Sequence, residues 1–185
     1  MDQKKYEKKL PHMTLVLGGA SSGKSKWAES LAKLYGGRRV YVATAQAFDS
    51  EMTAKIEAHR LARAGDGWET LEAPHDAPGA LRDCVAEVAL LDCATLWLSN
   101  RLFAEADLEA ECSELGAAAR GSDAPVIVVS NEVGAGIVPE NALARRFRSA
   151  QGALNQDLAR AADLVVLVTA GLPLVLKGIL PEAVV

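Results

Sequence analysis

Five short runs of apolar residues, with little alternation between apolar and polar positions, stand out along the chain. They are residues 14–17, 40–43, 88–92, 126–130 and 164–168. Runs of this length, rich in β-branched residues and leucine, are typical of β-strands that are covered on both faces. Longer stretches with helical patterns lie between them. This alternation predicts an α/β fold with a mostly parallel central sheet and helices on both faces.

Three stretches carry helical patterns. Residues 25–34 and 50–64 are predicted to be helices, and a third helix follows from apolar residues spaced three or four apart: Leu143, Phe147, Ala150, Leu154, Leu158 and Ala161. The stretch 65–78 is rich in Gly, Pro and Asp, and we expect an irregular loop there. Residues 172–176 are expected to form a final short strand or an interface segment.

Length and composition narrow the class of protein. The 185 residues suit one compact domain, which we expect at 13–185, after a charged tail at 1–12. The chain is 50% hydrophobic and 24% charged, which excludes wholesale disorder. Its formal net charge is -4 and only 5% of its residues are aromatic, so a nucleic-acid partner is not expected.

The sequence also predicts where the protein works. No apolar run reaches the roughly 18 residues of a membrane span, so none is expected. The charged N-terminus has no apolar segment of the kind found in secretory signals. Cys84, Cys93 and Cys112 are odd in number and lack C-x-x-C spacing, so we interpret them as reduced thiols of a cytoplasmic protein.

A glycine-rich segment follows the first apolar run and precedes the first predicted helix. It fits the pattern G-x-x-x-x-G-K-[ST], with the residues Gly18, Gly19, Ala20, Ser21, Ser22, Gly23, Lys24 and Ser25. Glycines let backbone N–H groups surround phosphate oxygens, and the helix N-terminus adds partial positive charge. Lys24 would reach the β- and γ-phosphates, and Ser25 would hold Mg²⁺. The alternative is a Gly/Ser-rich turn that caps a helix, and the strand–loop–helix order favours the phosphate loop.

A carboxylate ends the third apolar run. Asp92 follows four apolar residues, a Walker-B-like pattern, and would hold the Mg²⁺ directly or through water. Taken alone, Asp92 is better explained as the cap of the next helix. Beside a phosphate loop, the metal role is favoured.

A histidine lies in the helix predicted after the second run. Met52, Ile56, His59 and Arg63 share one face of that helix, and Asp49 can serve as its N-cap. His59 could cover the edge of the core. It could instead act as a nucleophile or general base, with Arg60 and Arg63 stabilising phosphate charge. The spacing does not decide between these interpretations.

Two further segments stay open. The loop 131–139 follows the fourth run, and its Asn131 and Glu132 could contact substrate or nucleotide, or could belong to a structural turn that leads into the next helix. For Arg145, Arg146 and Arg148 the pattern favours a solvated helix face or a subunit contact over a phosphate site.

Taken together, these segments resemble the bifunctional adenosylcobinamide kinase / adenosylcobinamide-phosphate guanylyltransferase family of cobalamin biosynthesis. The resemblance covers residues 13–178 and rests on blocks in the order of the family: LGGASSGKS (17–25), YVATAQAFDSEM and KIEAHRLAR (within 41–63), the region of Trp68 and Glu72, LLDCATLWLSN (90–100), SNEVGAGIVPENALARRFRSAQGALNQDLARAADLVVLV (130–168) and GLPLVLKG (171–178). A phosphate loop alone is generic, whereas NEVGAGIVP and the histidine block are far more specific.

The resemblance implies a RecA-like P-loop NTPase fold and a homotrimer. It implies that the hydroxyl of the aminopropanol arm of adenosylcobinamide is phosphorylated with ATP or GTP. GMP is then transferred from GTP to that phosphate through a guanylylated histidine, which matches His59. Matching nucleotide-binding positions are Gly18 to Ser25, Ala43, Thr44, Ala45, Arg60, Arg63, Glu72 and Asp92.

Two other functions remain in competition at this point. The first is a small-molecule P-loop kinase without nucleotidyl transfer, which would need Lys24, Ser25 and Asp92 but not His59. The second is a nucleotide-gated regulator or binding module without turnover. The histidine block and NEVGAGIVP together favour the bifunctional enzyme.

Overall fold

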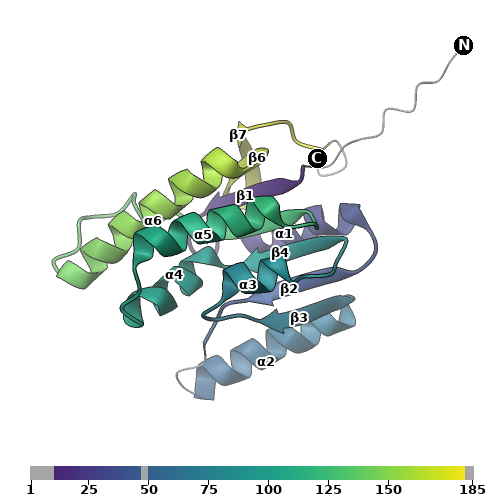
Figure 1. Ribbon diagram of the computed structural model, residues 1–185, viewed down its shortest axis with the longest axis horizontal. Coiled ribbons are helices and arrows are strands. Elements are labelled where there is room, and N and C mark those ends of the chain that lie inside the picture. The colour runs from purple at the N-terminus through teal and green to yellow at the C-terminus, as the bar shows by residue number, and fades with distance from the viewer. Residues whose placement is uncertain (1–10, 47–49, 182–185) are drawn as a thin grey trace, which may run out of the picture.

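The computed structural model describes residues 11–46 and 50–181. In the helix after the second strand, the description leaves out the side chains of residues 50–53, 55, 58, 59 and 62. Its centre is a seven-stranded sheet with the order β3-β2-β4-β5-β1-β6-β7 (Figure 1). All neighbouring strands are parallel except β6 and β7, which form an antiparallel hairpin. The strands are β1 (Met13–Gly18), β2 (Arg39–Ala43), β3 (Trp68–Glu72), β4 (Val88–Asp92), β5 (Val126–Asn131), β6 (Leu164–Thr169) and β7 (Leu172–Lys177).

Helices cover both faces of the sheet. The helices are α1 (Lys24–Ala32), extended by a 3₁₀ turn (Lys33–Tyr35), α2 (Ser50–Gly65), α3 (Ala77–Arg82), α4 (Ala94–Phe103), α5 (Leu108–Gly121) and α6 (Ala142–Ala161). Helices α3 to α6 lie on the face turned to the viewer in Figure 1, and α1 packs on the opposite face. Helix α2 lies alongside the edge strand β3. The predicted α/β architecture, a mostly parallel sheet with helices on both faces, is confirmed.

Successive side chains of the central strands enter two separate cores. In β4, Ala89 and Leu91 pack under α3 to α6, whereas Val88 and Leu90 pack under α1. Because side chains alternate along a strand, a strand covered on both faces must be apolar at every position. This is why the five apolar runs of the sequence are β1, β2, β4, β5 and β6.

The expectation of an irregular loop at 65–78 is wrong, because β3 lies within that stretch. In β3 only Trp68 is buried, packed edge-to-face against Tyr41, and the residues after it are exposed or half-buried. An edge strand with one buried residue has no apolar run, so its pairing with β2 was not visible in the pattern.

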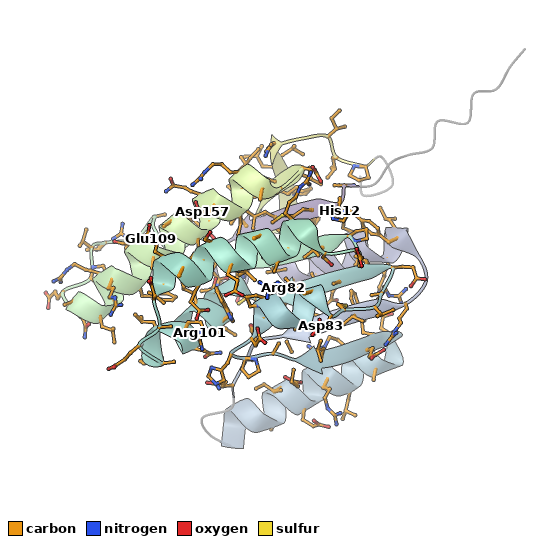
Figure 2. The ribbon with its side chains drawn as sticks, viewed as in Figure 1. His12, Arg82, Asp83, Arg101, Glu109 and Asp157 are labelled. Atoms are coloured by element: carbon orange, nitrogen blue, oxygen red, sulfur yellow. The ribbon has the colours of Figure 1, made fainter. Side chains whose placement is uncertain are left out.

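Helix α5 was also not predicted, although the sequence contains its signals. Asp107 caps its first turn by accepting from the N–H groups of Glu109 and Ala110, and acidic residues follow in that turn. Figure 2 shows the charged side chains around this layer of helices. Arg82 of α3 pairs with Glu114 of α5 (2.7 Å), and Arg101 of α4 pairs with Glu111 (2.6 Å). These pairs tie α3 and α4 to α5.

The three cysteines are buried and free, in agreement with their interpretation as thiols. Burial raises the pKa of Cys93 and of Cys112 to about 11, so both remain protonated and unreactive at neutral pH. None of the helices in the described part of the chain has the length and apolar character needed to cross a membrane.

Candidate functional site

The candidate site lies at the carboxyl edge of the parallel sheet, where β1, β2, β3, β4 and β5 all end. Glu72, Ala43 and Asp92 stand in one row across β3, β2 and β4. Strands β5 and β1 extend further, to Asn131 and Gly18, which pair with each other. This edge is where open α/β sheets bind their ligands.

The phosphate loop connects β1 to α1 and is braced by backbone hydrogen bonds. Within it, the N–H of Ser22 and the ammonium of Lys24 donate to the carbonyl of Gly19, at 3.3 and 3.2 Å. From outside it, the N–H of Gly171 donates to the carbonyl of Ser22 (2.8 Å), and the N–H of Glu132 donates to that of Gly18 (3.0 Å). The loop is therefore held from the β6–β7 turn and from the end of β5.

Two loop positions need glycine. Gly23, the N-cap of α1, has a φ of 92°, in the left-handed region. A Cβ on Gly18 would lie 2.6 Å from the carbonyl oxygen of Val168.

The hydroxyl of Ser22 is buried without a hydrogen-bond partner among the described residues. An open donor beside the N-terminus of α1 fits a phosphate oxygen.

Asp92 is held by a tyrosine from the neighbouring strand. Its Oδ2 accepts a hydrogen bond from the Tyr41 hydroxyl at 2.7 Å. Burial raises the pKa of Tyr41 well above its usual range and the Asp92 charge adds to this, so the phenol stays a donor. Burial also raises the pKa of Glu29 on α1, and Asp92 raises it further.

The donor set fits magnesium rather than a protein-only metal cage. Ser25 lies in the first turn of α1, and Asp92 ends β4, two strands away from β1. Two strand spacings are about 10 Å. Among the described residues no group of three or more His, Cys, Asp or Glu could hold a metal. Mg²⁺ instead uses one or two protein oxygens together with waters and substrate phosphates.

The stretch Ala43, Thr44 and Ala45 mainly joins β2 to β4. Thr44 is fully buried, and its hydroxyl donates to the carbonyl of Cys93 (2.8 Å) and accepts from its N–H (2.9 Å). Ala43 is also buried, whereas Ala45 is half-buried. Both hydrogen bonds of the Thr44 hydroxyl are thus made to the backbone of Cys93. A nucleotide contact of residues 43–45 stays a prediction.

The two predicted arginines of α2 have different surroundings. Arg60 is exposed and pairs with Glu57 on its own helix, at 2.7 and 2.9 Å. The guanidinium carbon of Arg63 lies 3.9 Å from the ring centroid of Tyr41. This cation–π contact links α2 to the residue that holds Asp92.

His59 and the phosphate loop belong to distant parts of the sheet. His59 is in α2, and its side chain lies outside the described part of the chain, as does the expected N-cap Asp49. Helix α2 runs along β3, which stands four places from β1 (Figure 1). Four strand spacings are about 19 Å. The structure therefore gathers the phosphate loop and Asp92 at one edge and leaves the helix of His59 at the outer strand.

A buried polar cluster supports the loop after β5, and the sequence analysis did not identify it. Asn155 accepts from the Ser130 hydroxyl (2.6 Å) and from the Gln151 amide (2.9 Å), and it donates to the carbonyl of Asn131 (3.1 Å). Thr95 accepts from the N–H of Asn131 at 2.7 Å. The available signal was Gln151 and Asn155, two amides four residues apart on an otherwise apolar stripe.

Arginines of α6 reach back to the same loop. Arg148 donates from Nη2 to the carbonyl of Gly134, and Arg145 donates to the carbonyl of Pro139 at 3.0 Å. Arg145 is exposed, in line with the predicted solvated face, but its guanidinium has loop partners. These contacts join residues 6 to 14 positions apart.

Comparisons with known proteins agree over nearly the whole chain. The family model described as cobinamide kinase / cobinamide phosphate guanyltransferase matches residues 14–176. The bifunctional adenosylcobalamin biosynthesis protein CobP of Pseudomonas aeruginosa is 43% identical over 169 residues, covering 89% of this chain and 96% of that protein. The bifunctional adenosylcobalamin biosynthesis proteins CobU of Escherichia coli and Salmonella typhimurium are each 40% identical over 182 residues, covering 89% of this chain and 99% of theirs.

Among solved structures, the crystal structure of the RadB recombinase is similar with a TM-score of 0.46 and 21% identity. The match covers 85% of this chain and 74% of that one.

Proposed function

This chain belongs to the cobinamide kinase / cobinamide phosphate guanyltransferase family, and from that premise we propose how its residues carry the two reactions. In the first, the phosphate loop binds ATP or GTP, and the γ-phosphoryl group passes to the hydroxyl of adenosylcobinamide. In the second, His59 takes GMP from GTP and passes it to the new phosphate, which gives adenosylcobinamide-GDP. The observation that carries this proposal is the braced phosphate loop beside Asp92, in a chain that matches the family along residues 14–176.

The kinase step needs positioning and charge stabilisation more than covalent chemistry. The loop amides and Lys24 would hold the β- and γ-phosphates, and the carbonyl of Gly19 would release the Lys24 ammonium to the nucleotide. Ser25 and Asp92 would hold Mg²⁺, which neutralises charge on the phosphate oxygens. Tyr41 would keep the Asp92 carboxylate in place.

The transfer step divides one displacement into two. A neutral imidazole nitrogen of His59 would attack the α-phosphorus of GTP, forming an N–P bond while the bond to pyrophosphate breaks. A phosphate oxygen of the acceptor would then attack the same phosphorus and release the imidazole. Because α2 lies along β3, we propose that α2 moves toward the phosphate loop when GTP binds.

Covalent labelling tests this function. With Mg²⁺ and GTP labelled at the α-phosphate, acid-labile and alkali-stable GMP is expected on His59. The variant His59→Ala should lose this label and guanylyl transfer while it keeps kinase activity. Since the attacking imidazole must be neutral, labelling should also decrease at acid pH. GTP binding without label, or a flat rate from about pH 5 to 8, would leave a plain P-loop kinase as the function.

We further propose a homotrimer that works in the cytoplasm. Strand β7 is an edge strand with exposed Leu172, Leu174 and Leu176, at 72, 58 and 54%. Exposed apolar edges of this kind commonly pair with other chains. Buried free thiols suit a reducing compartment. A solution mass other than three chains would exclude the trimer.

A further inference from the structure

A cavity of about 410 Å³ lies between the β5–α6 loop (residues 132–141) and helix α6. We call it the α6 cavity. Its described lining is Gly134, Val138, Arg145, Arg148, Ser149, Gly152, Ala153 and Gln156. The β5–α6 loop, which contributes Gly134 and Val138 to this lining, leaves the carboxyl edge of the sheet at the end of β5, the strand next to β1. In Figure 1, the beginning of α6 projects beyond this edge.

The chemistry of the α6 cavity selects an anion. Two lining side chains are guanidinium groups, two more are polar, and none of the described lining residues is acidic. Arg148 uses Nη2 for the carbonyl of Gly134, while its Nη1 is buried without a partner among the described residues. The nearby carboxylate of Glu132 is directed to the N–H of Gly134 at 2.5 Å. Paired guanidinium donors are suited to phosphate oxygens.

Exposed apolar side chains flank the cationic donors. Val138 lines the cavity and is 65% exposed, and Ile137, which precedes it on the β5–α6 loop, is 97% exposed. Apolar contacts beside a small anionic pocket fit a bulky ligand that carries one phosphate on an arm, rather than a free inorganic ion.

The proposed nucleotide site, the phosphate loop, begins on the strand next to β5. The phosphate loop leads into α1, which covers the face opposite to α6. Strand β5 is the direct neighbour of β1, and the N–H of Glu132 is bonded to Gly18. The loop that lines the α6 cavity therefore begins next to the phosphate loop, and the two are supported by helices on opposite faces of the sheet.

We propose that Arg145 and Arg148 in the α6 cavity bind the phosphate of adenosylcobinamide phosphate, and that Ile137 and Val138 contact the body of the same molecule. This inference rests on the proposed function, because the acceptor is the substrate of its second reaction. It assigns the two arginines a binding role and separates the acceptor site from the nucleotide site.

The test compares Arg148→Gln and Arg145→Gln with Arg146→Gln. Arg146 is exposed on the same helix and does not line the cavity, so it is a matched control for charge. Equilibrium binding of adenosylcobinamide phosphate and of unphosphorylated adenosylcobinamide is measured for each protein. Losing a charged hydrogen bond to phosphate should weaken binding of the phosphorylated form by about 10- to 100-fold. Binding of the unphosphorylated form should change much less.

The ratio of the two affinities separates recognition from structural damage. A disturbed β5–α6 loop would weaken both ligands equally, and that outcome would overturn the proposal. So would an equal effect of Arg146→Gln, or a raised KM for GTP in the labelling reaction. Arg148→Lys keeps the charge and should restore part of the ratio.

The labelling reaction needs no acceptor, so it reports on the proposed function independently. Unchanged labelling of Arg148→Gln with a reduced affinity ratio is the expected combination. If wild-type protein takes no label, the guanylyl-transfer proposal fails, while the affinity ratio still decides whether the α6 cavity binds the phosphorylated acceptor.

Discussion

The phosphate loop and the β5–α6 loop begin at the ends of adjacent strands but are held in different ways. Backbone groups hold the phosphate loop: Ser22 and Gly19 within it, and Gly171 and Glu132 from outside. Side chains hold the β5–α6 loop, through the amide of Asn155 and the guanidinium groups of α6. The conformation of the phosphate loop therefore depends on the positions of its glycines. The conformation of the β5–α6 loop depends on side chains of helix α6.

This difference suits two kinds of ligand. Triphosphate groups are the same in every nucleotide, so a backbone cradle with one lysine can bind them. A large acceptor needs a surface whose side chains define its shape, and a loop anchored by α6 supplies one. Changes in the first region should affect both reactions, and changes in the second should affect mainly the acceptor.

The largest effect is expected from Lys24→Ala. The ammonium that now bonds to Gly19 would be missing from the phosphates in the kinase transition state. A kinase kcat/KM lower by about 100-fold or more is expected. Lys26→Ala removes an exposed lysine of the same helix and is the control. Steady-state kinetics decide this, and a Lys24→Ala enzyme as active as the control would refute the cradle.

Asn155→Ala should give the next largest effect. Ser130 and Gln151, both fully buried, would lose a hydrogen-bond partner, and Asn131 would lose its donor. We expect a loss of about 3 kcal/mol in the free energy of unfolding, measured in urea. Affinity for adenosylcobinamide should fall more than affinity for GTP. Equal losses for both ligands would mean that the two loops are not separate units.

Gly18→Ala should have a smaller effect, confined to the phosphate loop. The new Cβ would lie 2.6 Å from the carbonyl oxygen of Val168, so β1 and β6 must shift. Overpacking of this kind should cost about 2 kcal/mol of unfolding free energy and weaken GTP binding. Gly19→Ala is the matched control, because a Cβ there meets nothing within 4 Å. Equal stability of the two variants, measured by urea unfolding, would contradict this account.

The strands covered on both faces were predicted correctly, because their cause is local. The five apolar runs became strands because a doubly covered strand must be apolar at each position, and this shows in consecutive residues. The phosphate loop was predicted from contiguous glycines and a lysine, and the segment does lie between β1 and α1. Strand β3 and helix α5 were not predicted. The edge strand buries one residue of five, so it has no apolar run. The signals of α5, which are Asp107 and the acidic residues of its first turn, are local but were not recognised.

The sequence by itself determined the α/β class and the family and predicted the phosphate loop, because each shows in short contiguous segments of the chain. Only the tertiary structure decided what surrounds them. In the folded chain the Thr44 hydroxyl bonds to Cys93. Arg63 stacks on the ring of Tyr41, whose hydroxyl donates to Asp92. Asn155 and Arg148 donate hydrogen bonds to Asn131 and Gly134, where the β5–α6 loop begins. These contacts join residues that are as many as 51 positions apart. Their geometry arises when strands pair and helices pack, and no local pattern encodes it.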